Sequence, residues 1–285
     1  MRCESITGRE RRGPNARGPH DATEGPLGDR APLPADPSLC PALPETAIAR
    51  FDAGCASLGL GDLPDGTRDG ILGHLRLLLA WTAAVNLTAI RDPEAAVVGH
   101  LLDSLAAVPL LREAGVRRFV DLGSGGGHPG LPLALALPAE RALLVDSIAK
   151  KAAFLEVAVA AAGVVDRVAV AAVRVEDLAA DRVHRERWPA VTVRAVASLP
   201  ELVELAFPLL VPGGILLAWK RAGLGDERSR GLRAVAALGG GSMEVAPLPA
   251  AIAGLEDHRL VVVRKSGPTG RDWPRPPAER KRRPW

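Results

Sequence analysis

The segment FVDLGSGGGHPG, residues 119–130, decides the fold class of this 285-residue chain. Two apolar residues end a predicted strand, Asp121 follows at its carboxyl end, and Gly123, Gly125 and Gly127 then stand at every second position. Glycines at this place let the chain turn sharply out of a strand and expose backbone amides to a ligand. The segment therefore predicts a ligand-binding loop at the carboxyl edge of a sheet.

A second run, RALLVD at residues 141–146, predicts a strand that ends in Asp146. This carboxylate stands about 20 residues beyond the glycines, the spacing at which an acid binds the ribose hydroxyls of an adenosine. The alternatives are a loop without a ligand and a carboxylate that only caps the next helix. A GxGxxG is present at Gly125, Gly127 and Gly130, but its third glycine comes too late in the loop for the dinucleotide fingerprint. The order acid-x-Gly-x-Gly-x-Gly instead resembles motif I of the class I methyltransferases, which implies S-adenosylmethionine as the cofactor.

Composition limits the class of protein. The chain is 47% hydrophobic and 24% charged, enough for a substantial core, and no stretch reaches about 18 uninterrupted apolar residues, so we expect no membrane span. Its first residues, MRCESITGRERRGPN, contain no apolar signal-peptide core, which predicts a cytoplasmic protein. Cys3, Cys40 and Cys55 are an odd number without CxxC spacing, so neither a disulfide framework nor a metal site is predicted. We expect a monomer.

The net charge of +3 is unevenly distributed. Eight basic residues against two acidic ones give residues 264–285 a local charge of +6, which leaves about −3 for the rest of the chain. This asymmetry favours a polyanion partner that contacts one edge of the molecule. A tail that only improves solubility is the alternative interpretation.

Four segments are predicted along the chain. Residues 1–44 are rich in Pro, Gly, Arg and Asp without apolar periodicity, and we expect them to be disordered. Residues 45–115 have helical spacing and predict an N-terminal helical cap, in which Asp92 caps a helix. In residues 116–265 strand and helix patterns alternate, which is typical of a parallel sheet with helices on both faces. Residues 266–285 form a basic C-terminal tail.

Seven strands are predicted in this α/β core. They are residues 117–121, 142–146, 168–172, 190–194, 215–219, 243–245 and 259–264. Helices are expected between them, most clearly at 149–162 and 199–210. A Rossmann-like sheet of seven strands is the size of the core of the class I S-adenosylmethionine-dependent methyltransferases.

Seven blocks, in this order, carry a more specific resemblance. They are NLTAIRDP (86–93), HLLDS (100–104), DLGSGGGHPGLPLA (121–134), LLVDSIAKKAAFL (143–155), RVED (174–177), VRAVASL (193–199) and AWK (218–220). Together they resemble the bacterial 16S ribosomal RNA guanine-N7 methyltransferases, historically the glucose-inhibited division protein B family, over about residues 46–275. The resemblance implies transfer of a methyl group from S-adenosylmethionine to N7 of a guanine in the 530 loop of 16S rRNA, with that RNA or the small ribosomal subunit as the partner.

The resemblance also implies roles for individual residues. Gly123 and His128 match the family's loop contacts to the cofactor, Val175 and Glu176 match the pair beside the adenine, and Arg194 matches an arginine near the cofactor. His128 is itself a departure, because the family commonly has an apolar residue there.

Methylation of guanine N7 needs no general base, because this nitrogen carries an in-plane lone pair and no proton. Positioning and oriented dipoles are then expected to do most of the catalysis, and no catalytic residue is assigned. The sequence agrees by omission. The fourth predicted strand continues as VRAVASLP at 193–200, without the Asn/Asp-Pro-Pro-aromatic motif of exocyclic-amine methyltransferases, and no cysteine follows Cys55 to act as a nucleophile.

Other polar residues have structural interpretations. Glu176 could simply stand in the first turn of a helix, where an acidic residue is favourable, without binding a ligand. His100 and Asp103 stand three apart on one helical face and are interpreted as holding the cap against the core. His74 and His258 are interpreted as ordinary surface or core residues.

RNA recognition is expected to depend on phosphate contacts and shape, because the chain has no Tyr and only four Phe for base stacking. The predicted contacts are Lys220 and Arg221 at the sheet edge and Arg271 and Arg275 in the tail. Arg221 is the second departure from the family, which usually has Gly there. Two other functions stay open: a methyltransferase for a small molecule or protein, and a noncatalytic RNA-binding protein on the same fold.

Overall fold

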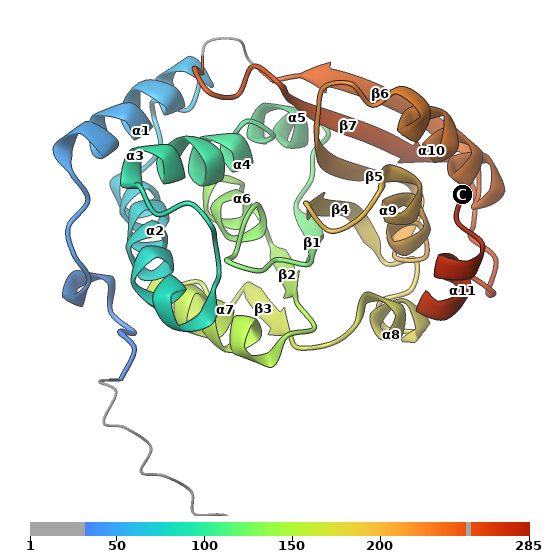
Figure 1. Cartoon of the computed structure of the whole chain (residues 1–285), viewed down its shortest axis with the longest axis horizontal. Coiled ribbons are helices and arrows are strands. Elements are labelled where there is room, and N and C mark those ends of the chain that lie inside the picture. Colours follow the sequence, from blue (N-terminus) through green and yellow to red (C-terminus); the bar gives the residue numbers. More distant parts are fainter. Residues whose placement is uncertain (1–31, 249–251) are drawn as a thin grey trace, which may run out of the picture. The chain divides into compact units, whose positions relative to one another are not determined.

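The computed structural model describes residues 32–248 and 252–285, and its compact unit is Leu33–Trp285. One sheet contains seven strands in the order β3-β2-β1-β4-β5-β7-β6 (Figure 1). The strands are β1 (Arg118–Leu122), β2 (Arg141–Val145), β3 (Val168–Ala171), β4 (Trp188–Arg194), β5 (Leu210–Arg221), β6 (Gly241–Pro247) and β7 (His258–Lys265). This arrangement confirms the predicted class I methyltransferase fold.

The expectation of a parallel sheet is wrong at β7. Strands β1 to β5 pair in parallel, whereas β7 is antiparallel to both of its neighbours, β5 and β6. Only residues 248–257 separate β6 from β7. A parallel neighbour would need a crossover of about a dozen or more residues, so a connection of this length favours antiparallel pairing.

The helices cover both faces of the sheet, as predicted. On one face lie α1 (Glu45–Ser57), α2 (Asp65–Val85), α3 (Pro93–Ala96), η2 (Val97–Leu102), α4 (Asp103–Leu105), α5 (Val108–Glu113), α6 (Gly130–Ala136) and α7 (Ala149–Ala161). On the other lie α8 (Val175–Ala180), α9 (Leu199–Ala206) and α10 (Gly225–Ala237). Successive strand residues point to opposite faces: Phe119 joins the first cluster of buried residues and Val120 the second.

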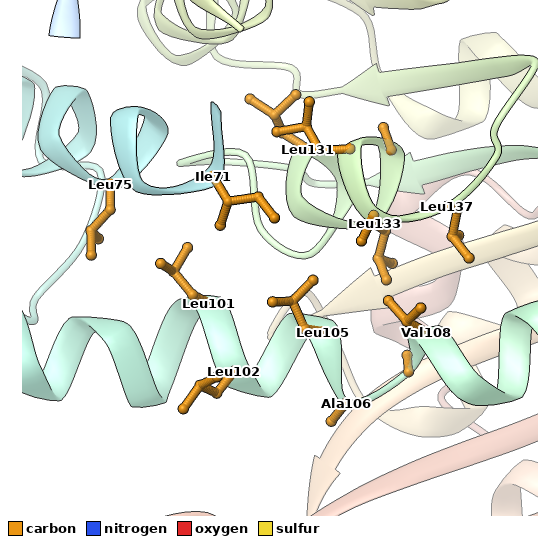
Figure 2. Packing of buried hydrophobic residues seen from close by; sticks show 14 of the residues in the cluster. Ile71, Leu75, Leu101, Leu102, Leu105, Ala106, Val108, Leu131, Leu133 and Leu137 are labelled. Carbon is orange, nitrogen blue, oxygen red and sulfur yellow. The ribbon is translucent and has the colours of Figure 1, made fainter. Parts of the chain in front are cut away.

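The run from α3 to α5, Pro93–Glu113, is long and apolar enough, by length and composition, to cross a membrane, but 67% of its most apolar window is buried inside the protein. Figure 2 shows why: Leu101 and Leu105 face Ile71 of α2 and Leu131 of α6. All four side chains have no exposed surface. The run is therefore a core helix, packed on one face of the sheet.

The N-terminal segment is ordered over a longer stretch than predicted. Residues 33–44 include the 3-10 helix η1 (Pro37–Leu39) and the buried side chains of Cys40 and Leu43. Arg76 of α2 donates hydrogen bonds to the carbonyl oxygens of Cys40 and Pro41. The sequence pattern missed this packing because prolines and single apolar residues have no periodicity. The rest of the predicted leader, residues 1–31, lies outside the described residues.

Most predicted boundaries agree with the structure to within a few residues. The largest differences concern the helix predicted at 199–210 and the strand predicted at 215–219, because α9 ends at Ala206 and β5 already begins at Leu210. Leu210 pairs with Trp188 of β4, so strand pairing overrides the continuing apolar pattern. The predicted cap is confirmed, since the Asp92 carboxylate accepts a hydrogen bond from the Ala95 amide at 2.8 Å.

The C-terminal segment 266–285, which ends in α11 (Pro277–Arg282), is fastened to α9 by one buried carboxylate. Glu204 is fully buried and accepts hydrogen bonds from the guanidinium of Arg275, at 2.6 and 3.0 Å, and from the indole of Trp285 at 2.6 Å. The indole rings of Trp273 and Trp285 stack with centroids 5.5 Å apart. The Arg275 guanidinium lies 5.0 Å from each ring centroid.

Arg275→Ala is expected to lower the free energy of unfolding by about 3 kcal/mol, because it leaves the Glu204 charge buried without its main partner. Chemical denaturation measures the change. Arg271→Ala removes the same charge from an exposed position of the same segment and is expected to cost well under about 1 kcal/mol. Equal losses in the two variants would contradict the importance of the buried pair.

Candidate functional site

A cavity of about 320 Å³ opens at the carboxyl edge of the sheet, beside the loop between β1 and α6. It brings together five of the predicted cofactor residues: Gly123, Asp146, Val175, Glu176 and Arg194. These residues stand at or after the carboxyl ends of four different parallel strands, and such ends meet at one edge of a sheet. The volume lies within the range of about 300–1,000 Å³ typical of small-molecule sites.

Asp146 stands at the end of β2 and ties this strand to the glycine loop. One carboxylate oxygen accepts a hydrogen bond from the Gly125 amide and the other accepts one from the Ile148 amide, both at 2.9 Å. Each oxygen of an ionised carboxylate has a second lone pair, so Asp146 can also accept from a ligand hydroxyl. The helix-capping and ribose-binding interpretations of this residue are therefore compatible.

The glycines of the loop are required by their surroundings. Gly123 and Gly127 have φ angles of +68° and +87°, which residues with a Cβ rarely adopt. A Cβ on Gly127 would lie 2.7 Å from Nε2 of His74, and one on Gly123 would lie 2.5 Å from a methyl carbon of Val196. The loop can thus lie close to α2 on one side and to the cavity wall on the other.

Four other predicted cofactor residues do not line this cavity in the described part of the chain: Asp121, Gly125, Gly127 and His128. Asp121 lies fully buried beneath the loop. Its carboxylate accepts hydrogen bonds from the Thr192 hydroxyl at 2.7 Å and the Gly130 amide at 3.3 Å. Burial raises the pKa of Asp121 to about 6, although these hydrogen bonds act in the opposite direction. Asp121 thus connects the end of the loop, at Gly130, to Thr192 of β4.

His128 lies in a stack of three histidine rings behind the loop, of which His74 and His128 are buried and His100 is partly buried. Its ring centroid is 4.5 Å from that of His74 and 4.9 Å from that of His100. Burial lowers the pKa of His74 and of His100 to about 4, and holds that of His128 well below its ordinary value. The three imidazoles are therefore neutral at physiological pH and fill the space as aromatic side chains would. An uncharged His128 is thus accommodated in the interior behind the loop.

The walls of the cavity suit S-adenosylmethionine. The apolar side chains of Ile148, Val173 and Val196 are 50%, 37% and 42% exposed, and all three line this cavity. Apolar surface of this kind accepts the faces of an adenine ring. Asp146 and Glu176 supply carboxylate acceptors for hydroxyl and amino groups. The residues present thus fit the predicted cofactor.

A second cavity, of about 410 Å³, adjoins the first, and Arg194 and Ala195 line both. Its other lining residues are Gly99, His100, Asp103, Trp219, Lys220, Arg221 and His258. Ala195 has a φ of +56°, a strained conformation for a residue with a Cβ. Such strain is concentrated at functional sites, where the surrounding structure enforces it. The junction of the two cavities is therefore a candidate for the place of reaction.

Arg194 separates the two cavities and is held from several directions. Its guanidinium donates hydrogen bonds to the Asp103 carboxylate at 2.8 Å, the Gly99 carbonyl at 2.9 Å and Nδ1 of His100 at 3.3 Å. The second oxygen of Asp103 accepts from Nδ1 of His258 at 2.8 Å. These contacts confirm that His100 and Asp103 hold the N-terminal helices against the sheet.

The predicted RNA contacts separate into different environments. Arg221 is exposed and lines the second cavity. Lys220 lines it too, but its ammonium donates to the Glu227 carboxylate at 2.6 Å and the Ala197 carbonyl at 2.9 Å. Arg271 lines a separate cavity, and Arg275 forms the buried pair with Glu204 described above.

The sequence interpretation missed several residues of the site. His258, interpreted as an ordinary residue, contacts Asp103 and lines the second cavity. The indole of Trp219 donates to the Asp103 carbonyl at 2.8 Å. Arg280 lines the first cavity from α11, more than 100 positions after Glu176 in the chain. A signal for His258 was its position directly before the strand predicted at 259–264, whereas nothing local pointed to Arg280.

Comparison with known proteins decides the family. A family model described as rRNA small subunit methyltransferase G matches residues 69–248, more than half of the chain. The chain belongs to this family. The rRNA small subunit methyltransferase G of Roseiflexus sp. (strain RS-1) is 42% identical over 207 residues, which cover 73% of this chain and 87% of the relative. That of Symbiobacterium thermophilum is 36% identical and covers 79% of this chain and 92% of the relative.

Comparison with solved structures supports the fold of this rRNA small subunit methyltransferase G family member. An O-methyltransferase from Bacillus cereus, solved in complex with SAH, has a TM-score of 0.50 and 19% sequence identity. The alignment covers 68% of this chain and 91% of that protein. At this identity the likeness concerns the fold alone.

Asp121→Asn is expected to change how stability depends on pH. Because the pKa of Asp121 is raised in the folded protein, its native state binds more protons than the unfolded state between about pH 4 and about pH 6, and its stability falls as pH rises through this window. Relative to the wild type, the variant should therefore gain up to about 3 kcal/mol between pH 4 and pH 7. Denaturant titrations across this range measure the difference, with the exposed Asp166→Asn as the control. A constant difference between Asp121→Asn and the wild type would contradict the buried-acid interpretation.

Proposed function

We propose that this protein transfers the methyl group of S-adenosylmethionine to N7 of a guanine in the 530 loop of 16S rRNA, as free RNA or within the small ribosomal subunit. The observation that carries the proposal is the pair of adjoining cavities that share Arg194 and Ala195. One has the carboxylates and apolar walls that an adenosine needs, and the other is large enough for a base. Membership of the rRNA small subunit methyltransferase G family supports ribosomal RNA as the acceptor. An rRNA substrate agrees with a cytoplasmic protein.

The properties of the methyl donor and of guanine N7 determine what the protein must do. S-adenosylmethionine, when bound, supplies an electrophilic methyl group on a sulfonium centre. Guanine N7 needs no deprotonation, so the task of the protein is to align the two reactants and exclude water. Asp146 would hold the ribose, and Ile148 and Val196 supply apolar surface to the first cavity. Arg194, kept in place by Asp103, defines the border across which the base must be held.

The neutral histidine stack contributes to this environment. A protonated imidazole behind the loop would oppose binding of a cationic sulfonium. Burial keeps His74, His100 and His128 uncharged, so the loop supplies backbone dipoles without a nearby fixed positive charge from these rings.

The decisive experiment is methyl transfer from labelled S-adenosylmethionine to 16S rRNA and to small subunits from cells that lack the protein. The modified position is then mapped by borohydride reduction and aniline cleavage, which detect N7-methylguanine. Asp146→Ala is expected to reduce transfer by about 100-fold or more, since it removes a ligand-binding carboxylate and unties the loop. Asp166→Ala, an exposed position away from both cavities, serves as the control. Label in proteins or small metabolites instead of rRNA would contradict the proposal.

Among the predicted RNA contacts, Arg221 is the one best placed to test. It is exposed beside the second cavity, whereas Lys220 and Arg275 are engaged in ion pairs. Arg221→Ala is expected to weaken RNA binding and to lower the slope of log K against log salt by about 0.7–0.9, the value for one lost phosphate contact. Arg233→Ala on α10 makes the same charge change outside both cavities. An unchanged slope for Arg221→Ala would exclude it from the interface.

A further inference from the structure

The C-terminal segment 266–285 contributes to the wall of the cofactor cavity. This segment lies outside residues 69–248, which the family model matches. Its helix α11 lies beside α8 and α9 (Figure 1) and places Arg280 in the same lining as Asp146 and Glu176. The Arg280 side chain is only 10% exposed. Composition alone would assign Arg280 to a solvated tail. In the structure its side chain is instead directed into the molecule.

The guanidinium of Arg280 is held at three points. Nη2 donates to the Glu176 carboxylate, and Nε donates to Glu201 of α9 at 3.3 Å. Nη1 donates to the backbone carbonyl of Arg275 at 2.6 Å. Since Arg275 is itself anchored on the buried Glu204, the position of Arg280 is determined by the fold of the whole segment.

Glu176 is the acceptor that matters for a ligand. It lies in the first turn of α8, its side chain is 21% exposed, and it lines the cavity next to Val175. Burial alone would raise the pKa of Glu176, but the hydrogen bonds from Arg280 and from a backbone amide, together with the positive charges of Arg280 and Arg174, outweigh burial and hold the pKa below its usual value. Glu176 is therefore an ionised acceptor, and such a group binds the amino or hydroxyl donors of an adenosine.

We propose that Arg280 is a positioning residue for the methyl donor: it orients the Glu176 carboxylate in the cavity, so that the C-terminal segment forms part of the cofactor site. This inference rests on the proposed function, because it takes the adenosine of S-adenosylmethionine as the ligand. It gives the segment a role in cofactor affinity that is separate from any contact with RNA.

The test is equilibrium binding of S-adenosylhomocysteine, measured by titration calorimetry on the full chain. This probe has the same adenosine and undergoes no methyl transfer. Arg280→Ala is expected to weaken binding by about tenfold or more, the effect of losing one charge-assisted contact. Arg280→Lys retains a donor for Glu176 and should recover part of the affinity. Arg282→Ala lies two residues away on the same helix, is exposed and should bind as the wild type does.

A double-variant cycle shows whether Arg280 acts through Glu176. In the Glu176→Ala background, Arg280→Ala should have little further effect, because the carboxylate that it orients is absent. Additive losses, or unchanged or tighter binding by Arg280→Ala, would overturn the inference. Thermal unfolding without ligand verifies that each variant is folded. If the wild-type protein itself does not bind S-adenosylhomocysteine, the proposed function fails, and this result differs from a failure of the Arg280 inference alone.

Discussion

The ion pair between Arg194 and Asp103 is the contact on which the arrangement of the site depends. Asp103 is 2% exposed, and its two oxygens bind Arg194 from β4 and His258 from β7, while Trp219 of β5 donates to its carbonyl. The pair therefore connects three neighbouring strands with the helices that precede the sheet. A buried charge is stable only when it is fully paired and hydrogen-bonded, so these elements are constrained to one relative position. The border between the two cavities is a consequence of that constraint.

Much of the fold was predictable from local patterns. The seven strands, the glycine loop and Asp146 follow from periodicity, turn chemistry and spacing, which are properties of short stretches of sequence. His258 was not identified, because its partner Asp103 is 155 positions earlier in the chain. The antiparallel direction of β7 was missed for a similar reason, since strand direction depends on the length of a connection more than on the residues of the strand.

The basic residues of 264–285 show that a count of charges cannot distinguish buried, paired side chains from exposed ones. Of the residues that give 264–285 its charge, Lys265 is fully buried and bonds to Glu186, Arg275 bonds to Glu204, and Arg280 bonds to Glu176. Composition treats each of them as surface charge. Their acidic partners belong to other elements of the chain, so only the tertiary structure separates a structural arginine from one that is available to a polyanion.

The reversed strand β7 has one further consequence. His258 begins β7 and pairs with Arg221 at the carboxyl end of β5, so the amino end of one strand enters the edge at which the parallel strands finish. In a wholly parallel sheet this edge would be reachable only from loops that follow strands. Here the first residue of the last strand also reaches it, so that His258 lines the second cavity without belonging to a loop that follows a strand.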